Sequence, residues 1–175
     1  MAGLTPPRPL TADDNREGFA CGRDSLDNWF RRHAWRNQAS GVSRTSIVCD
    51  TATGAIVGYV SLSAAQIARG FLAKSAQRNR PDPLPAILLG QLAVDGQYHG
   101  RGIARSLMWF ALTTALRLSR DIGCFGVITQ PLDDGLRAFY QRFGFEDLPF
   151  DPQRGMIVRI IDLERSGHAI PFGTP

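Results

Sequence analysis

The stretch LAVDGQYHGRGIARSLM, residues 92–108, begins with an apolar run and ends with an amphipathic run. It has three glycines between the two runs, and two arginines, Arg101 and Arg105, stand near the last glycine. The first part of this stretch is typical of a buried strand and the last part of a helix, so the glycines fall in a strand-to-helix turn. Glycine leaves backbone N–H groups open to an anion, and the N-terminus of a helix favours negative charge. The glycines at 96, 100 and 102 therefore mark this turn as a candidate phosphate site, with Arg101 or Arg105 adding positive charge.

The residues around the turn narrow the kind of phosphate. A P-loop needs Lys and then Ser or Thr after its last glycine, whereas an isoleucine and an alanine follow Gly102. A dinucleotide-binding turn needs Gly or Ala where this chain has Arg105, although Asp121 lies near the spacing of a ribose partner. What fits is a pyrophosphate held by successive amides from Gly100 to Ala104, and coenzyme A carries such a group. A turn that only joins a strand to a helix is the alternative.

The elements that must position this turn alternate along a single chain of 175 residues, which is about the size of one domain. Hydrophobic spacing and the Gly and Pro positions predict the order of elements. We expect a helix capped by Asp24 or Ser25 and stopped by Gly41, strands at 44–50 and 55–65, an irregular loop at 66–85, a strand at 86–94, a helix at 101–120, a strand at 124–129, a helix from 133 to Gly144, and a strand at 156–162. This order predicts a mixed α/β fold. We assign residues 1–162 to one domain and residues 163–175 to an irregular tail.

Composition excludes several classes of protein. The chain has no apolar run of 18 residues and its first ten residues lack the features of a signal peptide, so we expect a cytoplasmic protein without a membrane partner. Its three cysteines, Cys21, Cys49 and Cys124, are spaced for neither a disulfide framework nor a CxxC metal site. We therefore predict reduced, structural cysteines and no metal.

The positive charge is almost entirely arginine. Lys and Arg number 20 against 16 Asp and Glu, and Lys74 is the single lysine. Arginine matches phosphate with two hydrogen bonds, so a surplus suits a polyanionic partner, although codon bias explains it equally well. Two groups stand close in sequence, and each fits either a solvated surface or a nucleic-acid contact: Arg31, Arg32 and Arg36 on the first helix, and Arg78 and Arg80 in the proline-bounded loop.

Two motifs resemble those of a known family. The stretch at 92–108 is similar to the acetyl-CoA signature of the GNAT family of N-acetyltransferases, a strand followed by Q/R-x-x-G-x-G/A. Gly102 and Ala104 match its last two positions, and His99 stands where the family has Gln or Arg. The segment LRAFYQRFGFE resembles the family's second signature, which it matches at Ala138, Phe139, Tyr140, Gly144 and Phe145.

The resemblance implies a fold, a reaction and a set of residues. The fold would be a single GNAT domain with a mixed central sheet flanked by helices, and the activity an acetyl-CoA-dependent N-acetyltransferase of the EC 2.3.1 class. Tyr140 would be the catalytic acid that protonates the departing thiolate. The residues implied in acetyl-CoA binding are Leu92, Ala93, Val94, His99, Gly100, Arg101, Gly102, Ile103, Ala104, Arg105 and Phe139.

The N-terminal third narrows the resemblance to the GNAT toxins of bacterial toxin–antitoxin pairs. The segments FACGRDSLDNWFRRHAWRNQASGVSRTSIV and NRPDPLPAILLGQLAVD carry it. It implies acetylation of the α-amine of aminoacyl-tRNA, which blocks translation, and a ribbon-helix-helix antitoxin as partner. The two arginine groups then become candidate tRNA ligands. A homodimer is compatible with the sequence.

Two other functions stay open at this point. One is a GNAT enzyme that acts on a small-molecule or protein amine. The other is a domain that binds coenzyme A or an antitoxin without turnover, which the departure at His99 keeps in view.

Overall fold

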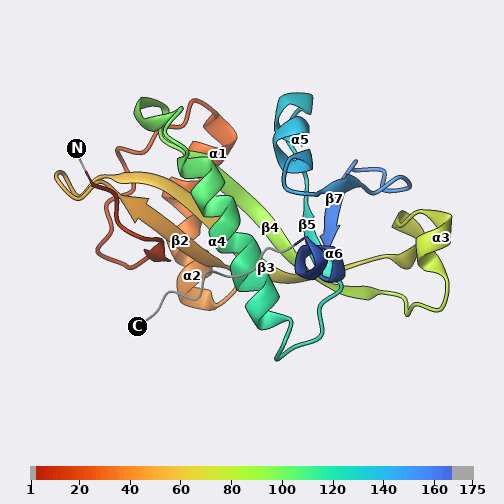
Figure 1. Ribbon diagram of the computed structural model, residues 1–175. Coiled ribbons are helices and arrows are strands. Elements are labelled where there is room, and N and C mark those ends of the chain that lie inside the picture. The colour runs from red at the N-terminus through yellow and green to blue at the C-terminus, as the bar shows by residue number, and fades with distance from the viewer. Residues whose placement is uncertain (1–2, 167–175) are drawn as a thin grey trace. The chain divides into compact units, whose positions relative to one another are not determined.

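The computed structural model describes residues 3–166, and Figure 1 shows its helices and strands. In chain order these are β1 (Arg8–Pro9), α1 (Asp24–Trp29), the π-helical segment η1 (Phe30–Ala34), α2 (Trp35–Ser40), β2 (Arg44–Cys49), β3 (Ile56–Ile67), the 3₁₀ turn η2 (Arg69–Phe71), α3 (Lys74–Gln77), β4 (Leu84–Val94), the 3₁₀ turn η3 (Gly96–Tyr98), α4 (Ile103–Leu118), β5 (Gly126–Thr129), α5 (Asp134–Gln141), β6 (Glu146–Asp147), β7 (Met156–Arg159) and α6 (Ile160–Arg165).

The strands hydrogen-bond in the order β1-β2-β3-β4-β5-β7-β6. The β4–β5 pair is parallel, whereas β1–β2, β2–β3, β5–β7 and β6–β7 are antiparallel. This mixed sheet confirms the predicted fold class. The chain forms two compact units, and each is made of two separate segments. The first unit contains the residues up to Ser63 together with Leu89–Ala111. The second unit contains Ala64–Leu88 together with the residues from Leu112 onward.

The first unit has an aromatic core between the N-terminal helices and the β2–β3 hairpin. Tyr59 on β3 is fully buried; its ring stacks on Phe30 at 4.2 Å and its hydroxyl donates to the Leu26 carbonyl at 2.9 Å. The same strand lies close under α4, because a Cβ at Gly58 would meet Leu107 Cδ1 at 3.0 Å. Glycine at this position lets the helix that begins at the glycine turn lie directly on the strand.

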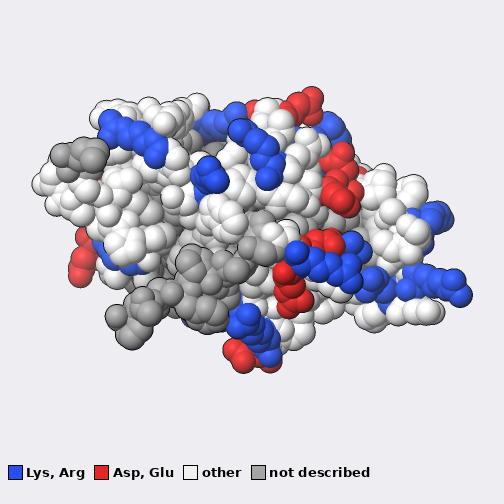
Figure 2. Space-filling view, in the orientation of Figure 1, with Lys and Arg blue, Asp and Glu red and all other residues white. Residues whose placement is uncertain are grey.

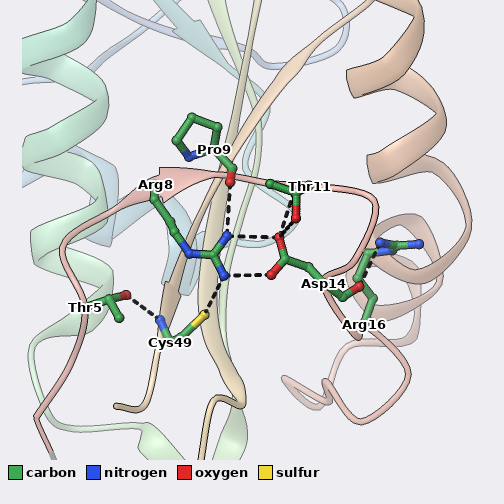
Figure 3. Close-up of polar contacts among 7 residues, drawn as sticks. All are labelled: Thr5, Arg8, Pro9, Thr11, Asp14, Arg16 and Cys49. Carbon is green, nitrogen blue, oxygen red and sulfur yellow. Dashed lines mark hydrogen bonds and ion pairs between the residues drawn. The ribbon is translucent and has the colours of Figure 1, made fainter.

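The N-terminal segment is fixed to β2 by a polar cluster around Arg8 (Figure 3). Its guanidinium donates to both carboxylate oxygens of Asp14, at 3.0 and 2.7 Å, and lies 3.7 Å from Cys49 Sγ. The Cys49 backbone N–H donates to Thr5 Oγ1 at 2.9 Å. The bond from Arg8 is the main reason that the pKa of Asp14 falls to about 2. These contacts cover one edge of the sheet with β1.

The second unit places α5 beside the β5–β7 pair. Gly126 begins β5 where a Cβ would meet the Val158 carbonyl at 2.7 Å, so the two strands approach closely. Asp133 caps α5 by accepting a bond from the Leu136 N–H at 2.8 Å, which confirms the predicted aspartate cap. Gly144, with φ of +88°, follows the end of the helix as predicted.

Two predicted elements differ in detail at the N-terminal side. The first helix begins with Arg23 as its N-cap instead of Asp24 or Ser25, and a π-helical segment interrupts it before Gly41 ends it at φ of +77°. The predicted loop at 66–85 is shorter, because β3 continues to Ile67, one helical turn forms at α3, and β4 begins at Leu84. Leu84 is 3% exposed, so its burial favours the strand in spite of the following proline.

The last predicted strand is also shorter. It ends at Arg159, and the chain continues as α6, with Leu163 only 1% exposed. The expected irregular tail is therefore helical up to Arg165, because a buried leucine anchors it. Residues 167–175 of that tail lie outside the described part of the chain. The two-residue strands β1 and β6 were not predicted, because they are too short to show an alternating pattern.

Candidate functional site

The glycine turn in the first unit lies between β4 and α4, which confirms the predicted strand-to-helix turn. Gly100 and Gly102 have φ values of +76° and +77°, a left-handed conformation that residues with a Cβ rarely adopt. Both residues are exposed, and apart from their chain neighbours no atom of residues 3–166 lies within 4 Å of the Cβ that either glycine lacks. The glycines are thus required by the backbone and leave open space above the turn.

The amides of this turn are unused within the described chain. The first backbone bond of α4 runs from the Ser106 N–H to the Gly102 carbonyl at 3.0 Å. Across residues 3–166, the N–H groups from Gly100 to Arg105 donate no backbone hydrogen bond. They sit at the N-terminus of a 16-residue helix, so the turn offers several donors and a positive helix end to an anion.

Asp95 holds the start of the turn in place. Its backbone N–H donates to the Val57 carbonyl at 2.9 Å, and its carboxylate accepts bonds from the N–H groups of Gln97 and Ala20, at 3.0 and 3.1 Å. Gly96 donates to the Ala20 carbonyl at 2.9 Å. The start of the turn is therefore anchored to both β3 and the segment before α1.

Tyr98 and Asp50 support the turn and were missed by the sequence analysis. The Tyr98 hydroxyl donates to Asp50 Oδ2 at 2.7 Å, and the Arg101 guanidinium lies 4.7 Å from the centre of the Tyr98 ring. This bond lowers the pKa of Asp50 and raises the pKa of Tyr98. The partners are far apart in sequence, so no local pattern could have paired them. The arrangement holds Arg101 at the turn.

His99 contacts the end of β4. Its Nε2 lies 2.7 Å from the Val94 carbonyl oxygen, and because a carbonyl only accepts, Nε2 carries the hydrogen. Of the strand residues implied in cofactor binding, Leu92 is half-buried while Ala93 and Val94 are buried. The imidazole therefore closes the turn back onto the strand, a positioning contact that leaves the backbone amides open.

Tyr140 in the second unit is buried, and its surroundings raise the pKa of its phenol. The side chain is 7% exposed, its ring packs edge-on against Phe139 and Phe145, and it shares a hydrogen bond with the Thr129 side chain at the end of β5. Burial raises the pKa of Tyr140, and the bond from Thr129 opposes this shift. The phenol is thus a proton donor at neutral pH. Phe139 packs against Tyr140, and both belong to the second unit, whereas the glycine turn belongs to the first.

A pocket of about 260 Å³ lies in the second unit next to Thr129. Its walls are mainly apolar, with Ile67, Phe71 and Leu148 among them, and Asp151 adds a carboxylate. Thr129 lines this pocket and also contacts Tyr140, so the pocket adjoins the phenol. The sequence analysis missed it, because its lining comes from strands and loops far apart in the chain.

In the first arginine group, Arg31, Arg32 and Arg36, one side chain is hydrogen-bonded to the backbone and the other two are exposed. Arg31 is half-buried and donates from Nη2 to the Phe19 carbonyl at 2.6 Å. Arg32 and Arg36 are exposed and have no hydrogen bond or ion pair within residues 3–166. Only the latter two present free guanidinium groups to a partner.

The second group divides in the same way. Arg80 donates from Nε to the Ala76 carbonyl at 2.8 Å, and its guanidinium lies 4.7 Å from the centre of the Phe125 ring. Arg78 is exposed. Figure 2 shows acidic side chains among the basic ones on the face in view.

The described residues, 3–166, include neither a metal-binding cluster nor a membrane-spanning helix. This part of the chain contains no group of three or more His, Cys, Asp or Glu that could hold a metal ion. It also contains no helix long and apolar enough to cross a membrane.

Comparison with known proteins identifies the family. A sequence model of the acetyltransferase (GNAT) family matches residues 10–145. The chain belongs to the GNAT family. This confirms the resemblance drawn from the two motifs, and with it the prediction of an acetyl-CoA-dependent N-acetyltransferase.

Three relatives of this GNAT protein are informative. A tRNA-acetylating toxin of Mycobacterium tuberculosis (strain ATCC 25618 / H37Rv) is 35% identical over 158 residues, 90% of this chain and 94% of the relative. The structure of AtaT complexed with acetyl-methionyl-tRNAfMet is similar with a TM-score of 0.86 and 26% identity, covering 94% of this chain and 99% of AtaT. The structure of AtaTR bound with AcCoA is similar with a TM-score of 0.82 and 26% identity. The match covers 95% of this chain and 99% of the AtaTR chain.

Proposed function

We propose that this GNAT enzyme transfers the acetyl group of acetyl-CoA to the α-amine of aminoacyl-tRNA and so acts as a toxin that blocks translation. The observation that carries this proposal is the 35% identity to a tRNA-acetylating toxin along 90% of the chain. The structures of AtaT with acetyl-methionyl-tRNAfMet and of AtaTR with AcCoA support the same acceptor and the same cosubstrate. A ribbon-helix-helix antitoxin and a homodimer belong to the proposal as partners.

The glycine turn is the part of the chain suited to the cosubstrate. Its unused amides from Gly100 to Ala104 would hold the pyrophosphate of acetyl-CoA, and Arg101 and Arg105 would add charge. The backbone from Leu92 to Val94 would bind the pantetheine arm and polarise the thioester carbonyl. Where one such oxyanion donor has been removed in other enzymes, the rate falls by about 10²–10³.

The α-amine of the acceptor does not require a strong general base. An α-amino group has a reference pKa of about 7.7–8.0, so a sizeable neutral fraction exists at neutral pH without a strong base. The neutral nitrogen attacks the thioester carbon, the C–N bond forms, and the C–S bond breaks. Tyr140 donates its hydroxyl proton to the departing thiolate, the proton lost by the amine goes to water, and water returns a proton to the Tyr140 phenolate. The raised pKa of Tyr140 suits this role, because the phenol is protonated before each turnover.

The acceptor itself would use two features of the structure. The pocket beside Thr129 accommodates an aminoacyl group next to the phenol of Tyr140. The exposed guanidinium groups of Arg32, Arg36 and Arg78 are available for tRNA phosphates. Arg31 and Arg80 belong to the same predicted set, but their bonds to backbone carbonyls give them a supporting role. Because charged tRNA is a cytoplasmic molecule, the expected cytoplasmic location belongs to this proposal.

The test is to incubate the protein with labelled acetyl-CoA and total charged tRNA and to identify the acetylated 3′ ends. We expect label on N-acetylated aminoacyl ends and none on deacylated tRNA, which is the matched control. Transfer to small amines or to peptide N-termini, with none to charged tRNA, would establish the second enzymatic alternative. Binding of acetyl-CoA without transfer to any of these acceptors would establish the non-catalytic alternative.

A further inference from the structure

Arg137 ties the helix that carries Tyr140 to two neighbouring segments of the second unit. It lies on α5, and its side chain is 12% exposed. One terminal nitrogen, Nη1, pairs with the Asp147 carboxylate on β6, and the other, Nη2, donates to the Arg154 carbonyl at 2.7 Å. A single guanidinium thus holds α5 to a strand and to a loop in the planar fork that only arginine provides.

The loop held in this way, Leu148–Gly155, forms one wall of the pocket. Its ends meet through a bond from the Leu148 N–H to the Gly155 carbonyl at 2.9 Å, and the Gly155 N–H donates to Asp151 Oδ2 at 2.9 Å. Leu148, Asp151 and Gly155 all line the pocket. Arg154 has φ of +54°, an unfavourable conformation for arginine, and its carbonyl is the one that Arg137 binds. The bond from Arg137 therefore acts at the strained point of the loop.

The helix needs such external support. With 8 residues, α5 is too short to be stable by itself, so its place depends on its contacts. Tyr140 and Arg137 stand three positions apart, which places them next to each other on the helix surface. A rotation or shift of α5 that releases Arg137 must also move the phenol away from Thr129.

We infer that Arg137 is a positioning residue that sets the place of the Tyr140 phenol and of the pocket wall together. The inference rests on the proposed function, in which Tyr140 is the acid and the pocket receives the aminoacyl group. It predicts a loss of turnover on substitution of Arg137, because a displacement of about 1 Å at a reacting centre costs about 10²-fold.

The primary test compares Arg137→Lys with Arg154→Asn. Lysine keeps the charge but cannot hold the carboxylate and the carbonyl in one fork, so we expect kcat with charged tRNA to fall by about 10–100-fold. Arg154→Asn is the matched control, because it removes the exposed 3.5 Å pair with Asp134, keeps the carbonyl that Arg137 uses, and tolerates a positive φ. It should stay within about 2-fold of the parent.

A double-mutant cycle separates positioning from general stabilisation. If Arg137 acts through the phenol, Arg137→Lys should cost little in a Tyr140→Phe background, because the group it positions is already gone. Full additivity of the two losses would overturn the inference, as would a folded Arg137→Lys protein with kcat within about 2-fold of the parent. Should Arg137→Lys fail to fold, Asp147→Asn weakens the same fork and enters the same cycle.

Amide hydrogen exchange supplies a readout that needs no activity. In the Arg137→Lys protein, segments 134–141 and 148–155 should exchange faster together, while the turn at 96–105 keeps its parent rate. Unchanged exchange in either of the first two segments would contradict the inference. A parent protein that transfers nothing to charged tRNA but shows the expected exchange would instead contradict the proposed function and leave the Arg137 link in place.

Discussion

The glycine turn and Tyr140 prepare for chemistry in opposite ways. Gly100 and Gly102 are exposed and left-handed, and the amides from Gly100 to Arg105 donate no backbone hydrogen bond within residues 3–166. Tyr140 is buried, surrounded by aromatic rings and bonded to Thr129. An anion is best bound by fixed donors that have no competing partner, whereas burial raises the pKa of a phenol that is already protonated at neutral pH. The difference matches the proposed function, in which the turn binds acetyl-CoA and Tyr140 is the acid.

The two arginine groups repeat this contrast on a smaller scale. In each group one guanidinium bonds to a backbone carbonyl, Arg31 in the first and Arg80 in the second. The neighbouring Arg32, Arg36 and Arg78 are exposed. A bonded guanidinium shapes the protein, and a free one is available to a polyanion.

The largest effect is expected from Tyr140→Phe. The ring keeps its contacts with Phe139 and Phe145, but the proton donor is lost, so kcat should fall by about 10²–10⁴. Acetyl-CoA affinity, measured by calorimetry, should stay within about 2-fold of the parent. A kcat within a few-fold of the parent value would remove Tyr140 from the acid role.

The next effect concerns the turn. Gly102→Glu places a side chain at φ of +77° and a negative charge among the amides, so acetyl-CoA affinity should fall by about 100-fold or more. Gly96→Ala is the matched control: Gly96 does not have a positive φ, and the nearest atom to its added Cβ, the Ala20 carbonyl oxygen, is 3.5 Å away. Calorimetry should give nearly the parent affinity for this control. Equal affinities for all three proteins would reduce the turn to a connection between strand and helix.

The free arginines should change the salt dependence of tRNA binding. If Arg32 and Arg36 bind tRNA phosphates, replacing both with alanine should lower the slope of log affinity against log salt by about 0.7–0.9 for each phosphate released. Filter binding at several salt concentrations gives this slope, with Arg117→Ala, an exposed arginine outside both groups, as the control. Identical slopes of log affinity against log salt in parent and variant would show that Arg32 and Arg36 do not contact tRNA phosphates.

The smallest effect is on the shape of the pH profile. The pKa of Tyr140 is raised above its ordinary value near 10, so the phenol stays protonated as the pH rises from 6 to 9. Over this range kcat/KM should rise as the α-amine of the acceptor loses its proton, with a midpoint of about 8, and then level off. Initial rates with charged tRNA test this, and a falling limb below pH 9 would contradict a protonated Tyr140 as the acid.

The sequence predicted those parts of the structure that depend on local geometry. A left-handed turn between a strand and a helix requires glycine, so Gly100 and Gly102 were visible from residue type and spacing. The Asp133 cap and the stop at Gly144 were visible for the same reason.

The sequence did not reveal contacts between distant segments. The bond from Tyr98 to Asp50 and the fork from Arg137 to Asp147 and Arg154 join residues that no periodic pattern relates. Leu84 and Leu163 show the same limit for the fold, because burial in the tertiary structure decided the strand and helix that the local sequence disfavoured.

The division of roles between the turn and Tyr140 is tested most directly by two acetyl donors, acetyl-CoA and acetylpantetheine, which lacks the pyrophosphate. The measurement is the ratio of kcat/KM for the two donors in the parent, Gly102→Glu and Tyr140→Phe proteins. We predict a strong preference for acetyl-CoA in the parent, the same preference at a lower rate in Tyr140→Phe, and its loss in Gly102→Glu. An unchanged preference in Gly102→Glu, or a lost preference in Tyr140→Phe, would contradict this division of roles.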